Sequence, residues 1–111
     1  MVAQGEVRRG EVFLVALSPT RGSEIRKTRP CVVVSPDDLN AELGTFIVAP
    51  LTTGAHPYPF RVPSRFAATA GHIVLDQIRS VDRERLIRRL GQVTPATLAR
   101  ALSTLQEMFA P

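Results

Sequence analysis

Short apolar runs alternate with clusters of glycine, proline and polar residues along the chain. The first run, Glu11–Leu17, is apolar on both faces, which indicates a strand that is buried from both sides. The same pattern predicts further strands at Pro30–Val34, Thr45–Leu51, Gly71–Ile78 and Gly91–Val93. Between them, the proline-rich stretch Thr52–Pro63 is predicted to be a loop, with at most a short edge strand around Phe60–Val62.

Two short helical segments are predicted between these strands. In the first, Ser35 is the N-cap, Pro36 takes the first helical position, Asp38 lies at the third, and Gly44 ends the turn. A second helical turn is predicted over Ser80–Leu86, capped by its first residue.

The C-terminal segment carries the clearest helical pattern. Thr94 is a good N-cap and Pro95 suits the first helical position. The apolar positions that repeat at helical spacing are Leu98, Ala101/Leu102, Leu105 and Met108/Phe109. Short strands followed by one amphipathic helix predict a mainly β fold, a small, mostly antiparallel barrel whose C-terminal α-helix packs on the sheet.

Length and composition limit what kind of protein this is. A chain of 111 residues, 44% of them hydrophobic, fits a single domain over residues 1–111 with one substantial core. No apolar run is long enough to span a membrane, and Met1–Glu6 lacks the apolar segment of a secretory signal. The single cysteine, Cys31, cannot form an intramolecular disulfide and is expected to be a small buried hydrophobe. We therefore expect a cytoplasmic protein.

The charge pattern changes the picture at one loop. The formal net charge is +4, and of 14 basic residues only Lys27 is a lysine. Four cations (Arg21, Arg26, Lys27 and Arg29) lie within nine residues around a single anion, Glu24. Arginine binds phosphate through two parallel hydrogen bonds, so a nucleic-acid backbone is the first partner to consider. A solvated basic hairpin explains the same pattern, and both interpretations stay open at this point.

Polar residues at the ends of predicted strands are the candidates for chemistry. Arg29 comes before a strand, Thr52 and Thr53 follow one, and Asp76-Gln77 interrupts an apolar run. Strand ends of a small barrel can meet at one rim, where a guanidinium and a hydroxyl would bind a phosphate under attack. Each residue also has an ordinary interpretation, as a turn residue or as a member of an ion pair.

Other familiar sites are not found in the sequence. There is no glycine-rich phosphate loop and no Cys/His spacing that fits a metal, so no cofactor and no metal ion are expected. His56 and His72 lie in different contexts, and their spacing does not support a two-histidine ribonuclease.

Several separated motifs, in the right order, resemble the MazF/PemK (Kid) toxins of bacterial toxin–antitoxin systems. The resemblance runs from Arg9 to the C-terminal helix. The matching motifs are Arg9-Gly10-Glu11-Val12, Leu17-Ser18-Pro19, Gly22-Ser23-Glu24, Thr28-Arg29-Pro30, Ile47-Val48-Ala49-Pro50-Leu51-Thr52 and Asp76-Gln77-Ile78-Arg79-Ser80-Val81-Asp82.

The resemblance implies an SH3-like barrel that forms a homodimer and cleaves single-stranded RNA without metal, with mRNA as the main expected substrate and rRNA as a second candidate. The 2′-hydroxyl would attack its own phosphate and leave a 2′,3′-cyclic phosphate and a 5′-hydroxyl. By the MazF pattern Arg29 and Thr52 are the catalytic pair, and Glu24 is our preference for the base. The residues expected to contact RNA or support the site are Ser23, Arg26, Lys27, Thr53, Asp76 and Gln77.

One departure from the Kid branch decides between two mechanisms. That branch has a histidine where Ser23 stands and an arginine where Val74 stands, together with an aspartate that matches Asp76. Because two of these three residues differ here, the acid–base assignment of that branch does not transfer. The Arg29/Thr52 assignment is favoured, with Asp76 in a supporting role.

The resemblance also implies partners. A small acidic antitoxin of the MazE type would neutralise the toxin, and the toxin–antitoxin complex is expected to bind operator DNA. The alternatives are a CcdB-type toxin that binds DNA gyrase and cuts nothing, and a plain SH3-like binding module. Neither needs an arginine and a threonine at strand ends, so Arg29 and Thr52 favour the nuclease.

Overall fold

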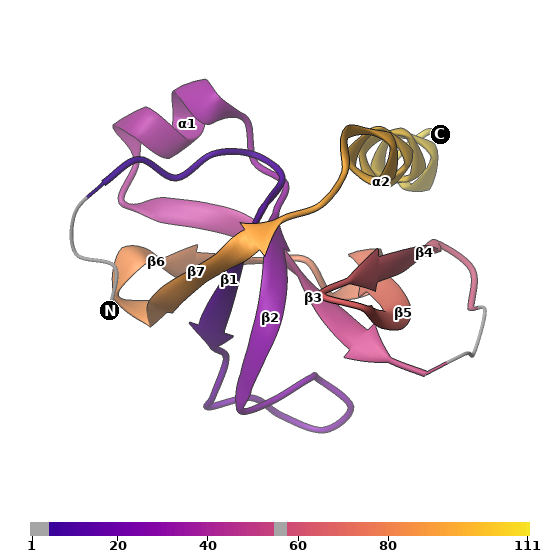
Figure 1. Cartoon of the computed structure of the whole chain (residues 1–111), viewed down its shortest axis with the longest axis horizontal. Coiled ribbons are helices and arrows are strands. Elements are labelled where there is room, and N and C mark those ends of the chain that lie inside the picture. Colours follow the sequence, from indigo (N-terminus) through magenta and orange to yellow (C-terminus); the bar gives the residue numbers. More distant parts are fainter. Residues whose placement is uncertain (1–4, 55–57) are drawn as a thin grey trace.

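The computed structural model describes residues 5–54 and 58–111. Within this part of the chain, seven strands form one sheet in the order β4-β5-β3-β2-β1-β7, with β6 added beside β3 (Figure 1). The strands are β1 (Glu11–Ala16), β2 (Thr28–Val33), β3 (Thr45–Thr53), β4 (Arg61–Phe66), β5 (Thr69–Val74), β6 (Arg79–Asp82) and β7 (Leu86–Gln92). The helical segments are α1 (Asp37–Glu42), η1 (Leu75–Gln77), η2 (Arg83–Arg85) and α2 (Pro95–Met108).

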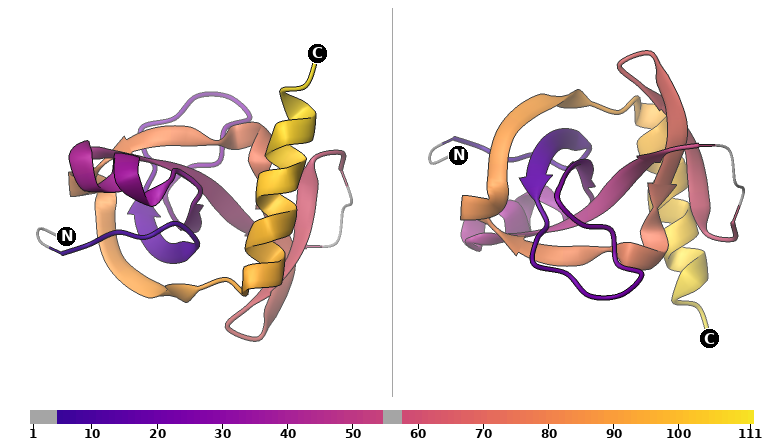
Figure 2. Two further views of the ribbon diagram at one scale, coloured as in Figure 1. Left: turned by 90° about the horizontal axis from the view of Figure 1, so that it is seen from above. Right: turned by 90° about the horizontal axis from the view of Figure 1, so that it is seen from below.

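All pairings in this sheet are antiparallel, and the strands curl round into a barrel-like ring in the end views (Figure 2). The long strand β3 organises the ring, because its first part pairs with β6, its middle with β2 and its last part with β5. The predicted mainly β, antiparallel fold with a C-terminal helix is thus confirmed.

The apolar runs in β1 to β3 are explained by two separate cores on opposite faces of these strands. Phe13, Val15 and Cys31 point into the core inside the ring, whereas their neighbours Val12 and Val32 point into the core under α2. Successive side chains of a strand alternate between faces, so a strand covered on both sides must be apolar throughout.

Helix α2 covers the second core as its pattern predicts. Thr94 caps it by accepting a hydrogen bond from the Thr97 backbone N–H, and Pro95 opens the first turn. Ala101 is fully buried, and the apolar side chains packed around it include Leu98, Leu105 and Met108. Phe109, which was grouped with Met108 in the predicted stripe, is instead exposed.

Several local predictions differ from the structure. Asp76 and Gln77 lie in η1, after β5 has ended, rather than inside a strand. The predicted helical turn Ser80–Leu86 is only partly helical: residues 80–82 belong to strand β6, and Arg83–Arg85 form the short helix η2, which is capped by Asp82 instead of Ser80. Tertiary pairing of β6 with β3 outweighs the local capping signal of Ser80.

The predicted cap of α1 is also wrong. Pro36 is the N-cap residue, and Ser35 lies buried before it. The Ser35 hydroxyl donates to Asn40 Oδ1 at 2.6 Å and accepts from the Ile47 backbone N–H at 3.0 Å. The serine therefore ties α1 to β3 instead of capping the helix.

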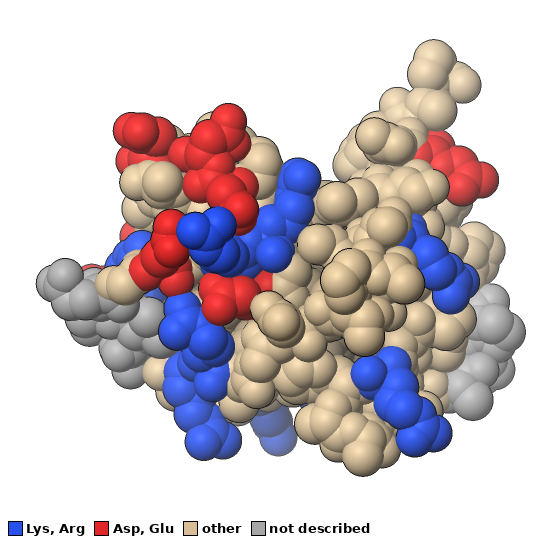
Figure 3. All heavy atoms as spheres, turned by 45° about the horizontal axis from the view of Figure 1, so that its top comes forward, with Lys and Arg blue, Asp and Glu red and all other residues tan. Residues whose placement is uncertain are grey.

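The face that carries both helices is not uniformly basic. Acidic side chains, including Asp37 and Asp38 of α1, gather at one end, and much of the surface over α2 is uncharged (Figure 3). This face offers a polyanion no continuous basic surface. No helix in the described part of the chain is long and apolar enough to cross a membrane.

Candidate active site

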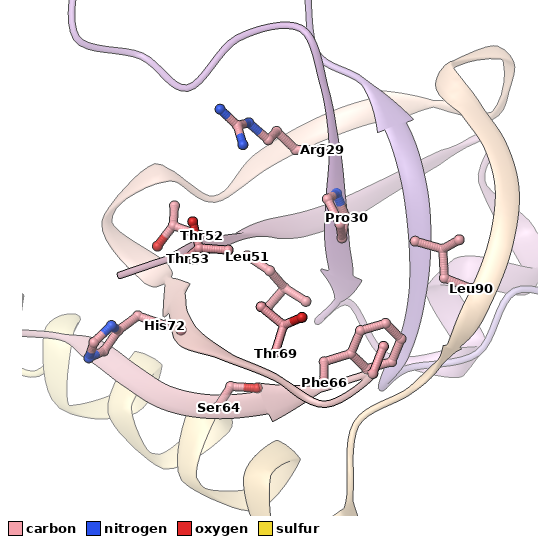
Figure 4. Close-up of a pocket in the computed structure, with 12 residues that line it drawn as sticks. Arg29, Pro30, Leu51, Thr52, Thr53, Ser64, Phe66, Thr69, His72 and Leu90 are labelled. Carbon is pink, nitrogen blue, oxygen red and sulfur yellow. The ribbon is translucent and has the colours of Figure 1, made fainter. Parts of the chain in front are cut away.

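Arg29 and Thr52 come from two different strands and line the same cavity. Arg29 lies in β2 and Thr52 in β3, so each belongs to a strand instead of flanking it as predicted. Together with Thr53 they border a cavity of about 370 Å³, whose apolar wall includes Phe66 and Leu90 (Figure 4). An arginine from one strand and two threonines from another thus line one cavity.

The cavity exists because β3 leaves β2. The two strands pair only as far as Pro50, which lies opposite Cys31, and the next three residues of β3 pair with β5. Proline has no backbone N–H for the ladder, which suits the point where the pairing changes. Arg29 and Thr52 therefore lie on opposite sides of a wedge between diverging strands.

A glycine allows β5 to approach this part of β3. Gly71 lies opposite Thr53 in the register, and a Cβ atom on Gly71 would lie 1.8 Å from the Thr52 carbonyl oxygen. Any other residue would push the two backbones apart. Gly71 thus helps to set the position of Thr52.

Glu24, Asp76 and Gln77 line a second cavity, of about 450 Å³. Pro50 lines this second cavity and Leu51 the first, so consecutive residues of β3 border the two. The six residues at the centre of the sequence-based prediction are therefore divided into two sets, three at each cavity.

The β1–β2 loop, residues 17–27, is tied to the segment around η1 at two points. The Gln77 side-chain oxygen accepts a hydrogen bond from the Ile25 backbone N–H at 2.8 Å. The Arg79 guanidinium donates to the Leu17 carbonyl at 3.0 Å. Glu24 is held within the loop itself, where its carboxylate accepts from the Arg21 backbone N–H.

The other predicted loop residues line neither cavity. Ser23, Arg26 and Lys27 are exposed. The Arg26 guanidinium donates to the Gly22 carbonyl at 2.9 Å, inside the loop. Their position leaves them free to meet a ligand that approaches from solvent.

Asp76 is paired with an arginine that sequence reasoning missed. Arg61 donates to both carboxylate oxygens of Asp76, from Nε at 3.0 Å and from Nη2 at 3.1 Å, and it also stacks over the Tyr58 ring at 4.8 Å. The hydrogen bonds from Arg61 lower the pKa of Asp76, and the same bonds raise the pKa of Arg61. Asp76 is therefore ionised at neutral pH and is not a proton donor there.

Arg61 lies in the short edge strand predicted around Phe60–Val62, which is the start of β4, but nothing in the sequence placed it opposite Val74, two residues before Asp76. The edge-strand signal was present, but the pairing register of β4 with β5, which brings Arg61 to Asp76, was not predicted. His72 was noted, and the structure places it opposite Thr52 at the edge of the first cavity. His56 lies outside the described residues.

Cys31 is the buried hydrophobe that its sequence context predicts. Its side chain is inaccessible to solvent, and burial raises the pKa of the thiol to about 12. A protonated, buried thiol is a poor nucleophile, so Cys31 is not part of the chemistry at either cavity.

Comparison with known proteins identifies the family. Residues 8–109 match the family described as PemK-like, MazF-like toxin of type II toxin–antitoxin system. Endoribonuclease MazF9 of Mycobacterium tuberculosis is 42% identical over 106 residues, which cover 85% of this chain and 88% of that protein. The crystal structure of MazF (Form-I) from Deinococcus radiodurans superimposes with a TM-score of 0.83 at 27% identity, over 95% of this chain and 97% of that one.

A MazE–MazF complex is also among the similar structures. The MazE-MazF (Form-III) crystal structure from Deinococcus radiodurans matches with a TM-score of 0.73 at 26% identity, covering 94% of this chain and 96% of that one. The family match spans nearly the whole chain and agrees with the fold. The chain belongs to the PemK-like, MazF-like toxins of type II toxin–antitoxin systems.

Proposed function

We propose that this chain is an endoribonuclease toxin that cleaves single-stranded RNA without a metal ion, with Arg29 and Thr52 as its catalytic pair. The endoribonuclease class follows from the family and from the names of its relatives. The observation that supports the pair is that a guanidinium from β2 and a hydroxyl from β3 border one cavity.

In the proposed reaction the 2′-oxygen of one nucleotide attacks the adjacent phosphorus, and the bond from phosphorus to the 5′-oxygen of the next nucleotide breaks. The 2′-hydroxyl loses its proton to a base, and the departing 5′-oxygen gains one. The guanidinium cation of Arg29 stabilises the additional negative charge on the five-coordinate phosphorus. Thr52 donates to a phosphate oxygen and fixes its orientation.

Glu24 is the proposed base. It lines the neighbouring cavity, and its carboxylate is held by the Arg21 N–H. Asp76 is less suited to act as the acid, because its pairing with Arg61 keeps its carboxylate ionised. The acid–base assignment of the Kid branch is disfavoured because Ser23 and Val74 stand where that branch has a histidine and an arginine.

The exposed cations of the β1–β2 loop attract the RNA backbone, and Arg26 and Lys27 are the residues we assign to this role. The same basic surface suits a small acidic antitoxin, and a MazE–MazF structure is among the related structures. We further propose that the toxin is a cytoplasmic homodimer and that its antitoxin complex binds operator DNA. The gyrase-binding alternative has no observation in its favour.

The test is a mapping of cleavage ends. The chain is incubated in EDTA with a mixed-sequence single-stranded RNA, and the strongest site is then remade with one 2′-deoxy nucleotide on the 5′ side of the cleaved bond. We expect cleavage of the all-ribose RNA with a 2′,3′-cyclic phosphate end, and no cleavage of the 2′-deoxy version. A requirement for metal, or equal cleavage of both RNAs, contradicts the proposal.

A further inference from the structure

His72 is a buried polar side chain that the proposed mechanism does not use. Its residue is 9% exposed, and the other buried polar residues in the described part of the chain are Ser35 and Asn40. Those two bond to each other and hold α1. His72 instead lies in β5, directly opposite Thr52 in the β3–β5 register.

The imidazole contacts the chain two residues beyond Thr52. Its Nδ1 atom lies 3.1 Å from the carbonyl oxygen of Gly54, the residue that follows β3. A carbonyl oxygen only accepts, so this hydrogen bond requires the proton on Nδ1. A buried polar group without such a partner would carry a desolvation penalty, which the bond removes.

The bond ties down the part of β3 that carries the threonines. The pairing of β3 with β5 covers only Leu51, Thr52 and Thr53, and Gly54 has a φ of +115°, a conformation that favours glycine. Among the described residues, His72 is the side chain of β5 that bonds to this end of β3. Without the imidazole, no β5 side chain would hold the end of this short ladder. Figure 4 shows the ring at the edge of the cavity, turned away from its centre.

We propose that His72 is a positioning residue for Thr52. By donating from Nδ1 to the Gly54 carbonyl, it holds the end of β3 against β5 and so fixes the Thr52 hydroxyl at the cavity. The proposal rests on the catalytic role of Thr52 given above. Its consequence is kinetic: a displaced Thr52 weakens contacts made in the transition state more than contacts made on binding, so kcat falls while KM changes little.

Two variants distinguish the effect of losing the hydrogen bond from the effect of losing the aromatic ring. His72→Phe keeps the ring and removes the donor, whereas His72→Asn places an amide donor close to the position of Nδ1. We expect kcat for the mapped RNA to fall roughly 10- to 100-fold in His72→Phe with KM within about 2-fold, and to be largely restored in His72→Asn. Thermal unfolding of both proteins confirms that they are folded.

A measurement on the unmodified chain does not depend on how either variant folds. Nitrogen-15 NMR of the histidine side chains reports which ring nitrogen of His72 carries the proton, and we expect Nδ1–H. An Nε2–H tautomer overturns the proposal, as does a folded His72→Phe with wild-type kcat. An equal loss of kcat in folded His72→Phe and folded His72→Asn also overturns it, because the loss would then not come from the missing hydrogen-bond donor alone.

The two proposals fail in different ways. If the wild-type chain does not cleave RNA in EDTA, the proposed function fails, whichever tautomer His72 adopts. If wild-type cleavage depends on Thr52 but tolerates His72→Phe, only the positioning role fails.

Discussion

The Thr52 carbonyl oxygen occupies the space where a side chain on Gly71 would begin, 1.8 Å from the Cβ position. The strand that carries the proposed catalytic hydroxyl is therefore packed against a residue that has to be glycine. The packing at Gly71 should therefore affect both the stability of the sheet and the position of Thr52.

Gly71→Ala should lower both stability and RNA cleavage. Forcing a methyl group into this contact separates β5 from β3, and overpacking of this kind costs roughly 1–3 kcal/mol. Gly44→Ala is the matched control, because a Cβ at Gly44 meets nothing within 4 Å. Urea unfolding and cleavage assays compare the two variants. Wild-type behaviour of Gly71→Ala would show that the contact is not tight.

The hydrogen bond from the Ile25 N–H to the Gln77 side chain predicts how fast this amide of the β1–β2 loop exchanges with solvent. Gln77→Leu removes the acceptor for the Ile25 N–H, and the loss of one hydrogen bond should speed hydrogen exchange of that amide by up to about 10-fold. Gln77→Glu keeps a side-chain oxygen as acceptor, so the Ile25 amide should exchange at nearly the wild-type rate in this variant. Equal protection in all three proteins would mean that other contacts hold the β1–β2 loop.

The Arg61–Asp76 pair predicts how stability depends on pH. The pKa of Asp76 is lowered in the folded chain from an ordinary value of 3.8, so the folded state favours the ionised carboxylate. The stability that the pair adds is present in full above about pH 3.8 and is lost as the pH falls through the lowered folded pKa. Asp76→Asn should therefore have a lower Tm than wild type at pH 7, with the gap closing in acid.

Glu42→Gln is the control for this titration, since Glu42 is an exposed carboxylate on α1. Its Tm should follow that of the wild type at every pH. A constant gap between Asp76→Asn and wild type down to the acid limit would contradict the role assigned to the ion pair.

The packing of α2 predicts a contrast between two neighbouring positions. Ala101→Asp places a carboxylate in the core under the helix, where no group is available to pair with it among the apolar side chains around Ala101, and should cost at least about 2 kcal/mol. Ser103→Asp introduces the same group on the exposed side of the helix and should be nearly neutral. Urea unfolding measures both. Equal stability of the two variants would mean that α2 is not packed on this core.

Local signals in the sequence predicted a good part of this fold. These signals depend only on residues close together in the chain. They are the threonine and proline at the start of α2 and the apolar runs of β1 to β3, and the structure has the predicted elements there. The sequence failed where a distant strand decides the outcome. Ser80 reads as a cap but pairs with Ile47 of β3.

The candidate site was predictable as a set of residues but not as a geometry. The motifs selected Arg29 and Thr52, and the structure places them at one cavity. That Glu24 and Asp76 line a different cavity depends on the contact of the β1–β2 loop with the segment around η1, which no local pattern encodes. The role of Arg61 was missed because its partner, Asp76, lies 15 residues away on another element.

Single-turnover cleavage of a defined RNA in EDTA tests the central claim most directly. We expect Arg29→Ala and Thr52→Val each to slow cleavage at least about 100-fold, as loss of one donor to a developing oxyanion does, while both proteins stay folded. Arg88→Ala, which removes an exposed arginine of β7, should cleave at nearly the wild-type rate. Near-wild-type cleavage by either folded Arg29→Ala or folded Thr52→Val would contradict the account.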